Sequence, residues 1–280
     1  LNTILRTIEN ILVPSTLTKY SGSKEKALSS FGALKGMAMP LLFFPSSFLN
    51  SLSTLLIPEI SEASALHQQK KVNRAVGLTL QITLLSSILL SGLFTMFARE
   101  LGLVIYNSEE VGFLLLVLAP LMPIMYVESV VDGMLKGLAE QLSCVRYNTL
   151  TSVLDVVFLY VLLPRHGVAG YVAVFAVTHA INLYLSIRRL LVVTEHRPRT
   201  ADFALPLLSL GLALLLTLPF PAAGGQIMRL MCRGGWFLTV LLAAFVLLQA
   251  LTQQDGSWLR RVLRRTLDNR GGAGYNEGSL

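Results

Sequence analysis

The chain has 280 residues, of which 53% are hydrophobic and only 14% are charged, and its mean hydropathy is +0.63. Soluble domains carry about 25% charged residues, so this composition excludes an ordinary soluble protein and predicts an all-α polytopic membrane bundle. The net charge of +7 does not indicate nucleic acid as a partner, because the basic residues fall in the gaps between apolar runs, as membrane topology requires.

Eight apolar segments follow one another along the chain, and we expect each to form a membrane helix. Their approximate ranges are 1–14, 31–57, 75–98, 111–127, 147–163, 168–187, 203–221 and 235–253. A candidate span needs about 18 apolar residues. Uncharged runs above that length occur at 36–58, 75–98, 167–187, 203–228 and 234–254. The chain begins at Leu1 inside the first segment, so we expect it to be a piece of a longer protein.

Lys and Arg are distributed unequally among the connections between these segments. Counted from the N-terminus, the even-numbered connections and the C-terminal tail carry twice as many as the odd-numbered ones. The positive-inside rule therefore predicts that the even side and the C-terminus face the cytoplasm. The tail begins as a basic amphipathic helix that can lie on anionic lipid headgroups. The arginines expected to contact these lipids are Arg260, Arg261, Arg264 and Arg265.

The second segment combines features that neither a soluble core helix nor a simple membrane anchor needs. Lys35 precedes a run that has no further charge until Glu59, and Pro40 and Pro45 interrupt that run. Prolines inside spans are tolerated where neighbouring helices, side chains or water satisfy the freed carbonyls. These prolines favour a bundle that bends between two states, although membrane helices are also simply richer in proline.

Three stretches together carry a resemblance to a known family. LLIPEISEA (55–63) closes a proline-containing span, LAPLMPIMYVESVVDGMLKGL (118–138) continues a span into a stretch with two glycines, and LYVLLPRHGVAGYVAVF (159–175) joins two spans through a tight turn. In their order and spacing they resemble the multidrug/oligosaccharidyl-lipid/polysaccharide (MOP) exporter superfamily. Within it they are most similar to the stage V sporulation protein B group of polysaccharide-biosynthesis membrane proteins, relatives of the lipid II flippases.

The resemblance implies a MATE-like exporter fold of fourteen helices, in which two six-helix lobes rock around a central cavity and two further helices follow. The present segments would be helices 7–14. They would form a C-terminal lobe at 1–195, two additional helices at 196–254 and the cytoplasmic tail at 255–280. A complete transporter would also require the missing N-terminal lobe. The implied function is a flippase that moves an undecaprenyl-pyrophosphate-linked oligosaccharide or peptidoglycan precursor across the bacterial plasma membrane by alternating access.

Two basic residues, Arg6 and Lys35, are the candidates for binding the pyrophosphate of such a substrate. Charged groups at membrane depth are costly and normally line water-filled space. The resemblance implies cationic cavity residues, and this role falls to Arg6 and Lys35 by location, arginine as a bidentate fork and lysine as a point charge. A purely structural reading is also open, in which Lys35 snorkels to the interface and Arg6 pairs with Glu9 or Asn10 on its own helix.

Further polar residues inside apolar segments are candidates for ion coupling or for structural hydrogen bonds between helices. They are Glu9, Asp155, His179 and Asn182. A second group, Glu128, Asp132 and Lys136, forms one helical stripe because its members are four residues apart. We expect this stripe to be an exposed cytoplasmic face rather than a site.

The sequence contains no P-loop, GxSxG, HExxH or CxxC motif, so we expect a transporter rather than an enzyme, without a cofactor or a metal site. Energy would come from an ion gradient, the membrane potential or substrate flux. A multidrug or cation antiporter of the same superfamily would need acids in its cavity, whereas Arg6 and Lys35 favour an anionic headgroup. A polytopic membrane glycosyltransferase or polymerase, or a non-transporting fragment, would also agree with the apolar composition.

Overall fold

The computed structural model describes residues 2–194, 200–217 and 226–247, and every regular element in them is helical. The predicted all-α fold is therefore confirmed. The tail at 255–280 and its arginines lie outside the described residues. The elements are α1 (Asn2–Ser21), α2 (Lys24–Phe31), η1 (Gly32–Ala38), α3 (Met39–Ala65), α4 (Gln69–Met96), α5 (Ala98–Tyr106), α6 (Glu109–Leu118), η2 (Ala119–Leu121), α7 (Met122–Gly137), α8 (Gln141–Thr194), α9 (Thr200–Thr217) and α10 (Gln226–Leu247).

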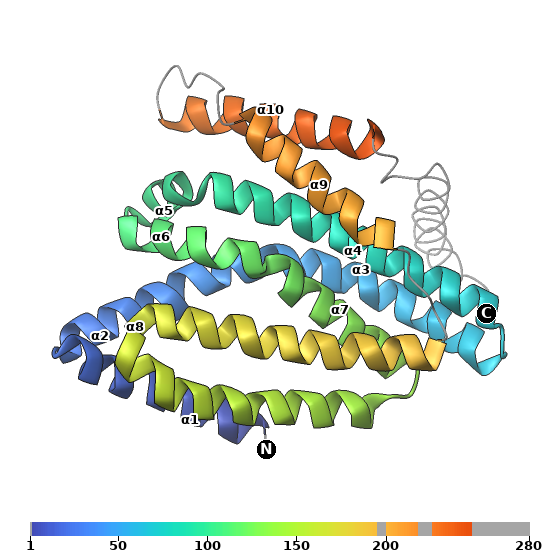
Figure 1. The fold of residues 1–280 in the computed structure, drawn as a ribbon, viewed down its shortest axis with the longest axis horizontal. Coiled ribbons are helices and arrows are strands. Elements are labelled where there is room, and N and C mark those ends of the chain that lie inside the picture. The colour runs from blue at the N-terminus through green and yellow to red at the C-terminus, as the bar shows by residue number, and fades with distance from the viewer. Residues whose placement is uncertain (1, 195–199, 218–225, 248–280) are drawn as a thin grey trace, which may run out of the picture.

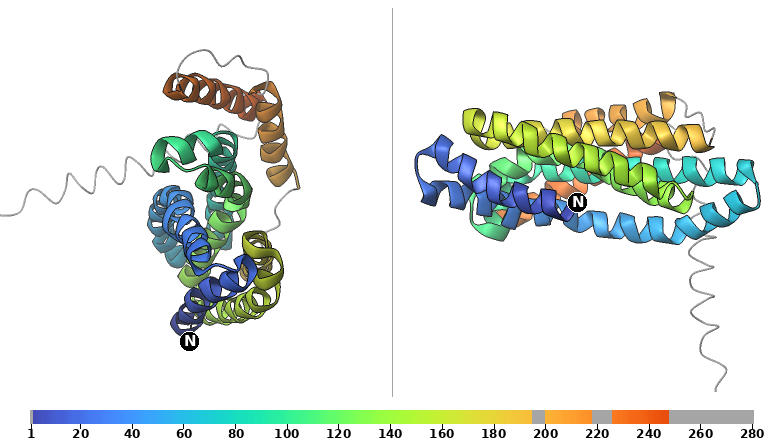
Figure 2. Two further views of the ribbon diagram at one scale, coloured as in Figure 1. Left: turned by 90° about the vertical axis from the view of Figure 1, so that its left-hand side faces the viewer. Right: turned by 90° about the horizontal axis from the view of Figure 1, so that it is seen from below.

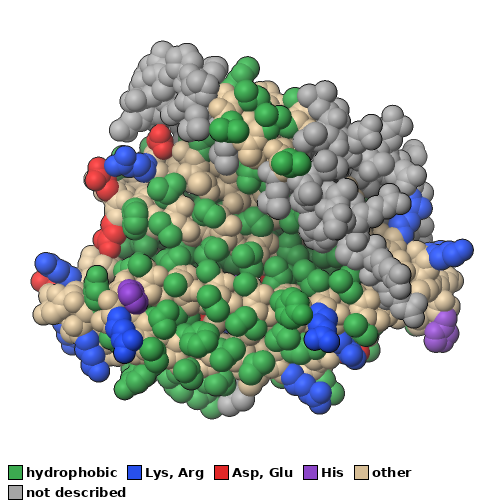
Figure 3. Space-filling view, viewed as in Figure 1, with side chains coloured by type: hydrophobic (Ala, Val, Ile, Leu, Met, Phe, Trp, Pro, Cys, Tyr) green, Lys and Arg blue, Asp and Glu red, His purple; other side chains and the backbone are tan. Residues whose placement is uncertain are grey.

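The helices run side by side along the long axis of the molecule (Figure 1). The α1–α2 turn, the α5–α6 hairpin and the bend of α8 lie at one end, and the α3–α4 and α7–α8 connections lie at the other. Charged side chains gather at these two ends, whereas the middle of the face seen in Figure 3 is mostly hydrophobic. Within the part of the chain that the structure describes, four helical stretches are long and apolar enough to cross a membrane: Lys24–Ser51, Gln69–Met96, Glu109–Gly137 and Gln141–Thr194. This pattern is that of a multi-pass membrane protein.

The helix α8 consists of two antiparallel limbs, in agreement with the two apolar segments predicted there. The bend is at Gly167, whose φ of 56° and ψ of −137° are not helical. A Cβ at this position would lie 2.5 Å from the ring of Tyr20 in α1, so glycine is required both for the backbone conformation and for the packing. The bend therefore lets the helix fold back on itself, and α8 packs against both α1 and α7.

The central helix of the bundle is α7, which packs against α3, α4 and α8. Its buried side chains Met122, Met125 and Tyr126 belong to the largest apolar cluster. The helices α9 and α10 lie on the opposite side of α4 from α1 and α8 (Figures 1 and 2). There Phe237 is completely buried, and Gly92 of α4 leaves the space that Leu210 and Phe237 occupy.

A continuous helical rod is formed by α2, η1 and α3, and Lys35 lies in its middle section. That section, η1, is a seven-residue π-helix. Such segments are rare and frequently occur at functional sites. Pro40 follows at the start of α3, where its missing N–H also breaks the regular hydrogen-bond ladder. The rod thus changes from a π-helix to an α-helix next to Pro40, whereas Pro45, which was also expected to interrupt the span, lies inside α3 without ending it.

The connection between α7 and α8 is held by an ion pair at the end of the bundle. Arg189 donates hydrogen bonds from Nε and Nη2 to the Glu140 carboxylate at 2.9 and 2.5 Å. These bonds lower the pKa of Glu140 below its ordinary value of 4.5. A carboxyl group whose pKa is lower in the folded chain than in the unfolded chain stabilises the fold at pH values above its unfolded-state pKa. This stabilisation is lost as the pH falls through the folded-state pKa.

We therefore expect Arg189→Gln to lower the thermal stability at pH 7 and to have a smaller effect as the pH falls below 4.5, because protonation of Glu140 then weakens the pair in the wild type as well. Because the pair is partly exposed to solvent, the loss at pH 7 should be small, on the order of 2 °C in Tm. Thermal unfolding in detergent over a series of pH values measures the difference. Arg188→Gln, a change at the exposed neighbouring position, is the matched control. A loss that does not diminish with falling pH would contradict the assignment.

Candidate functional site

A polar pocket of about 540 Å³ lies between α1, η1, α3, α7 and the two limbs of α8. All of the site residues proposed from the sequence line this pocket, although they come from separate elements. They are Arg6, Glu9, Lys35, Asp155, His179 and Asn182. Lys35 is eleven residues from the start of the candidate membrane span Lys24–Ser51, roughly 16 Å along a helix, and therefore lies within that span.

One end of the pocket is organised around Lys35. Its Nζ lies 2.8 Å from Oε1 of Glu9 in α1 and 5.3 Å from the centre of the Tyr171 ring in α8. The side chains of Lys35 and Glu9 remain 29% and 20% exposed, so a ligand in the pocket can reach this pair. Glu9 thus pairs with Lys35 and not with Arg6. Among the described residues Arg6 has no ion-pair partner.

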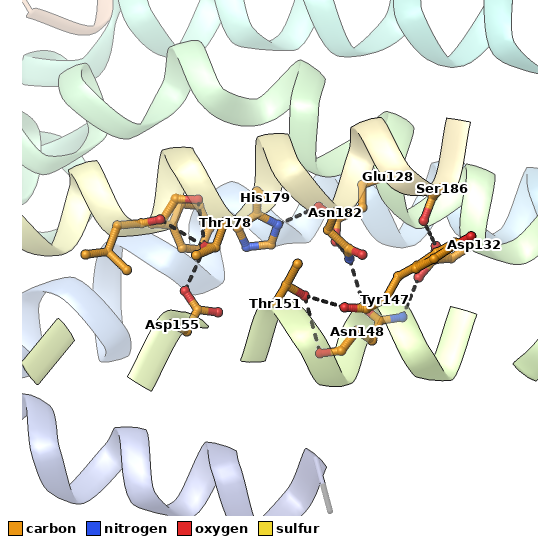
Figure 4. Close-up of polar contacts among 12 residues, drawn as sticks. Glu128, Asp132, Tyr147, Asn148, Thr151, Asp155, Thr178, His179, Asn182 and Ser186 are labelled. Carbon is orange, nitrogen blue, oxygen red and sulfur yellow. Dashed lines mark hydrogen bonds and ion pairs between the residues drawn. The ribbon is translucent and has the colours of Figure 1, made fainter. Parts of the chain in front are cut away.

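The carboxylate of Asp155 joins the two limbs of α8. Thr178 on the second limb donates a hydrogen bond from Oγ1 to Oδ1 of Asp155 on the first limb, at 2.7 Å (Figure 4). A structural hydrogen bond between helices was one of the two roles that the sequence allowed for this residue. Because Asp155 also lines the pocket, the hydrogen bond fixes its position without removing it from the site.

The prediction that Glu128, Asp132 and Lys136 form an exposed stripe is wrong for the two acids. Glu128 is only 9% exposed and Asp132 only 8%. The reason is the central position of α7, which turns this face toward α8 and the pocket rather than toward water. Lys136, one turn further along, is exposed and also lines the pocket.

A chain of hydrogen bonds connects these two acids with the two limbs of α8 (Figure 4). Nδ2 of Asn182 donates to Oε1 of Glu128 at 2.5 Å and to Oδ1 of Asn148 at 2.9 Å. Nδ2 of Asn148 in turn donates to Oδ2 of Asp132 at 2.8 Å. Nδ1 of His179 lies 2.6 Å from Oε2 of Glu128. The pocket is therefore crossed by one continuous polar network.

The pocket contains more acids than the sequence led us to expect. Its basic residues are Arg6, Lys35 and Lys136, and its acids are Glu9, Glu128, Asp132 and Asp155. Sequence reasoning missed Glu128, Asp132 and the amide of Asn148. A signal was present in the first limb of α8, where polar side chains recur at the three- and four-residue spacing of one helix face. They are Asn148, Thr151, Ser152 and Asp155.

Comparison with known proteins agrees with this architecture. The family model MatE matches residues 1–161. The chain is similar to Stage V sporulation protein B of Bacillus subtilis, with 28% identity over 165 residues, which cover 58% of this chain and 32% of that protein. It is also similar to Sporulation protein YkvU of Bacillus subtilis, with 31% identity over 117 residues, which cover 42% of this chain and 26% of that protein. The chain thus spans about a third or less of the length of these curated relatives.

Proposed function

The chain belongs to the MatE family of the MOP superfamily, and from this premise we propose that it is one lobe of a flippase in the bacterial plasma membrane. The substrate would be an oligosaccharide or peptidoglycan precursor linked to undecaprenyl pyrophosphate. A second lobe would complete the transporter, and the C-terminus would face the cytoplasm, as the distribution of Lys and Arg predicts.

The observation that carries this proposal is the position of Lys35 in an accessible polar pocket, eleven residues from the start of the candidate membrane span Lys24–Ser51. A basic residue at this depth is costly unless it serves a water-filled pathway. Arg6 lines the same pocket and has no ion-pair partner among the described residues. The two cations come from different helices and converge on one space, as binding of a diphosphate between helices requires.

The test is complementation of a bacterial cell depleted of its own lipid II flippase. The complete gene that encodes the chain is expressed, and growth and the accessibility of lipid-linked precursor at the outer leaflet are measured. Restored growth together with precursor at the outer leaflet supports a flippase for this substrate. Normal insertion into the membrane without either effect would contradict the substrate class.

A cation exporter of the same superfamily is the second candidate, and the four pocket carboxylates are the observation that favours it. Exporters of cationic compounds need acids in the cavity to attract their substrates. The two candidates differ in the charge of the ligand. A lipid diphosphate would compete with Glu9 for Lys35, whereas the binding of an organic cation would not depend on Lys35.

We expect Glu9→Gln to increase the affinity for an anionic lipid headgroup. The change removes the carboxylate that now neutralises Lys35 while keeping a side chain of the same size. Because the ion pair is partly exposed, the gain should be modest, about twofold to fivefold in Kd. Titration of the detergent-purified chain with a lipid pyrophosphate, followed by native mass spectrometry, measures it.

Glu59→Gln is the matched control, since Glu59 is exposed and lies outside the pocket. A decrease in affinity for the lipid pyrophosphate in Glu9→Gln, with Glu59→Gln unchanged, would contradict the competition between Glu9 and the diphosphate for Lys35.

A further inference from the structure

The short helix α5 has an apolar face that the described part of the chain leaves exposed. Leu101, Val104 and Ile105 are spaced at positions i, i+3 and i+4, so they lie on one side of the helix. The side chain of Val104 is 46% exposed and that of Ile105 is 48% exposed. We infer that this face is a lipid-binding surface, covered by the acyl chains of the leaflet at this end of the bundle.

The first argument is the separation of apolar and charged side chains around α5. Arg99 is exposed and lies five positions before Val104, which places it about 140° away around the helix. Glu100 lies between them, at the border of the apolar face. Ala98 and Gly102 are buried and form a third side. A helix with one charged and one apolar side is suited to the boundary between water and hydrocarbon.

The second argument is the depth at which α5 lies. The α5–α6 hairpin is at one end of the bundle (Figure 1), and a Cβ on Gly102 would lie 2.4 Å from the backbone N of Gly112. The two helices therefore touch through their backbones. Gly112 is the fourth residue of the candidate span Glu109–Gly137, and its neighbour Phe113 is 61% exposed.

The length of this span places the contact at the membrane interface. The 29 residues of the span are about 43 Å long at 1.5 Å per residue, close to the roughly 40–45 Å of a bilayer with its headgroups. Its fourth residue, Gly112, therefore lies at the boundary between the headgroups and the hydrocarbon. Because α5 packs against this position, its exposed apolar face is at the height of the lipid and not in the water above it.

Lipid is the occupant that fits this face. Contiguous exposed apolar side chains mark a surface that binds a membrane or another protein. The turn from α5 into α6 is followed directly by Glu109 and Glu110, which are exposed. Apolar side chains next to charged ones at the end of a span are typical of the membrane interface, where lipid surrounds the bundle.

The lipid-bound hairpin is connected to the helical rod that carries Lys35. Oγ of Ser30 in α2 donates a hydrogen bond to Oε1 of Glu110 in α6 at 2.8 Å, and η1 packs against α6. A hairpin held in the leaflet thus fixes the height of this end of the rod relative to the membrane. Lipid contact at α5 follows from the membrane location of the chain and does not depend on the identity of its substrate.

The test measures the depth of single spin labels on the full 280-residue chain in phosphatidylcholine vesicles. Cys232→Ser removes the exposed cysteine, and Cys144 stays because it is buried. A nitroxide is then attached at Val104→Cys or Ile105→Cys and, as the control on the charged side of the same helix, at Arg99→Cys. Oxygen concentrates in lipid and a nickel chelate stays in water, so the collision rates of the nitroxide with both reagents give its depth.

The labels on the apolar face are expected about 5–10 Å below the lipid phosphates, the depth that the apolar side of an interfacial helix reaches. The label at Arg99→Cys should lie nearer to the water by up to about 10 Å, the diameter of a helix. Nickel collisions as frequent on the apolar face as at the control would overturn the inference and place the hairpin in water. Protection of the apolar face from both oxygen and nickel would also overturn it, because a second copy of the chain or another protein would then cover the face.

A chemical readout covers the case in which a nitroxide disturbs the fold. In the same vesicles, the unlabelled thiol of Ile105→Cys should react with a water-soluble maleimide at least about tenfold more slowly than that of Arg99→Cys. Both the reagent and the reactive thiolate avoid hydrocarbon, and each pKa unit by which an apolar environment raises the pKa of a thiol lowers the thiolate fraction about tenfold. Equal reaction rates at the two positions would contradict lipid contact.

Discussion

Lys35→Ala is expected to weaken binding of a lipid pyrophosphate by about 10- to 100-fold, because it removes a charge-assisted contact at membrane depth. Arg6→Ala is expected to have a similar effect, since Arg6 lines the same pocket and makes no ion pair with a described residue, so that its guanidinium can bind the diphosphate. In the depleted cell, the Lys35→Ala protein should insert normally and fail to restore growth. Growth at graded expression levels, together with the amount of protein in the membrane, gives the result.

The control for these variants is Arg99→Ala. Arg99 is exposed, lies in α5 near the end of the bundle and does not line the pocket. Its replacement should leave both binding and growth unchanged. Full growth with Lys35→Ala at low expression would show that transport does not need Lys35 and that its role is structural, as the partner of Glu9 and Tyr171.

Gly102→Val is expected to cause a large loss of stability. A Cβ at Gly102 would lie 2.4 Å from the backbone N and 2.5 Å from the Cα of Gly112. Backbone atoms cannot rotate away as a side chain can, so the α5–α6 hairpin must open. We expect a loss of about 3 kcal/mol, the upper part of the range for overpacking. Thermal unfolding in detergent measures the change.

Gly211→Ala provides the matched comparison. Gly211 lies inside α9, and a Cβ there would have no atom within 4 Å. The replacement should therefore stabilise the helix, by about 0.5–1 kcal/mol, because alanine loses less backbone entropy than glycine. A Gly102→Val protein as stable as the wild type would contradict the close approach of α5 and α6.

The helices could be predicted from the sequence because the length of an apolar run depends only on residues that are neighbours in the chain. The bend at Gly167 is visible for the same reason, in the short break between the segments 147–163 and 168–187. The hairpin of α5 and α6 was not predicted. Residues 98–106 fall largely in a connection between apolar segments, because the charge pair Arg99 and Glu100 ends the preceding apolar run.

The candidate site was predicted only in part, for a physical reason. Helical spacing shows which residues share a face, and it correctly grouped Glu128 with Asp132. It cannot show what that face meets, because this depends on the packing of α7 against helices distant in the sequence. The pairing of Lys35 with Glu9 is equally non-local, since 26 positions separate the two residues. Polar residues within spans were therefore identified, but their partners required the fold.

Binding of a pyrophosphate group at Lys35 is tested most sharply by competition between ligands. The detergent-purified chain is incubated with a lipid pyrophosphate, and the bound lipid is counted by native mass spectrometry in the wild type and in the double variant Arg6→Ala/Lys35→Ala. We expect stoichiometric binding to the wild type, displacement by excess inorganic pyrophosphate and about 100-fold weaker binding to the double variant. Equal binding to both proteins, or binding that pyrophosphate does not displace, would contradict it and place the lipid outside this pocket.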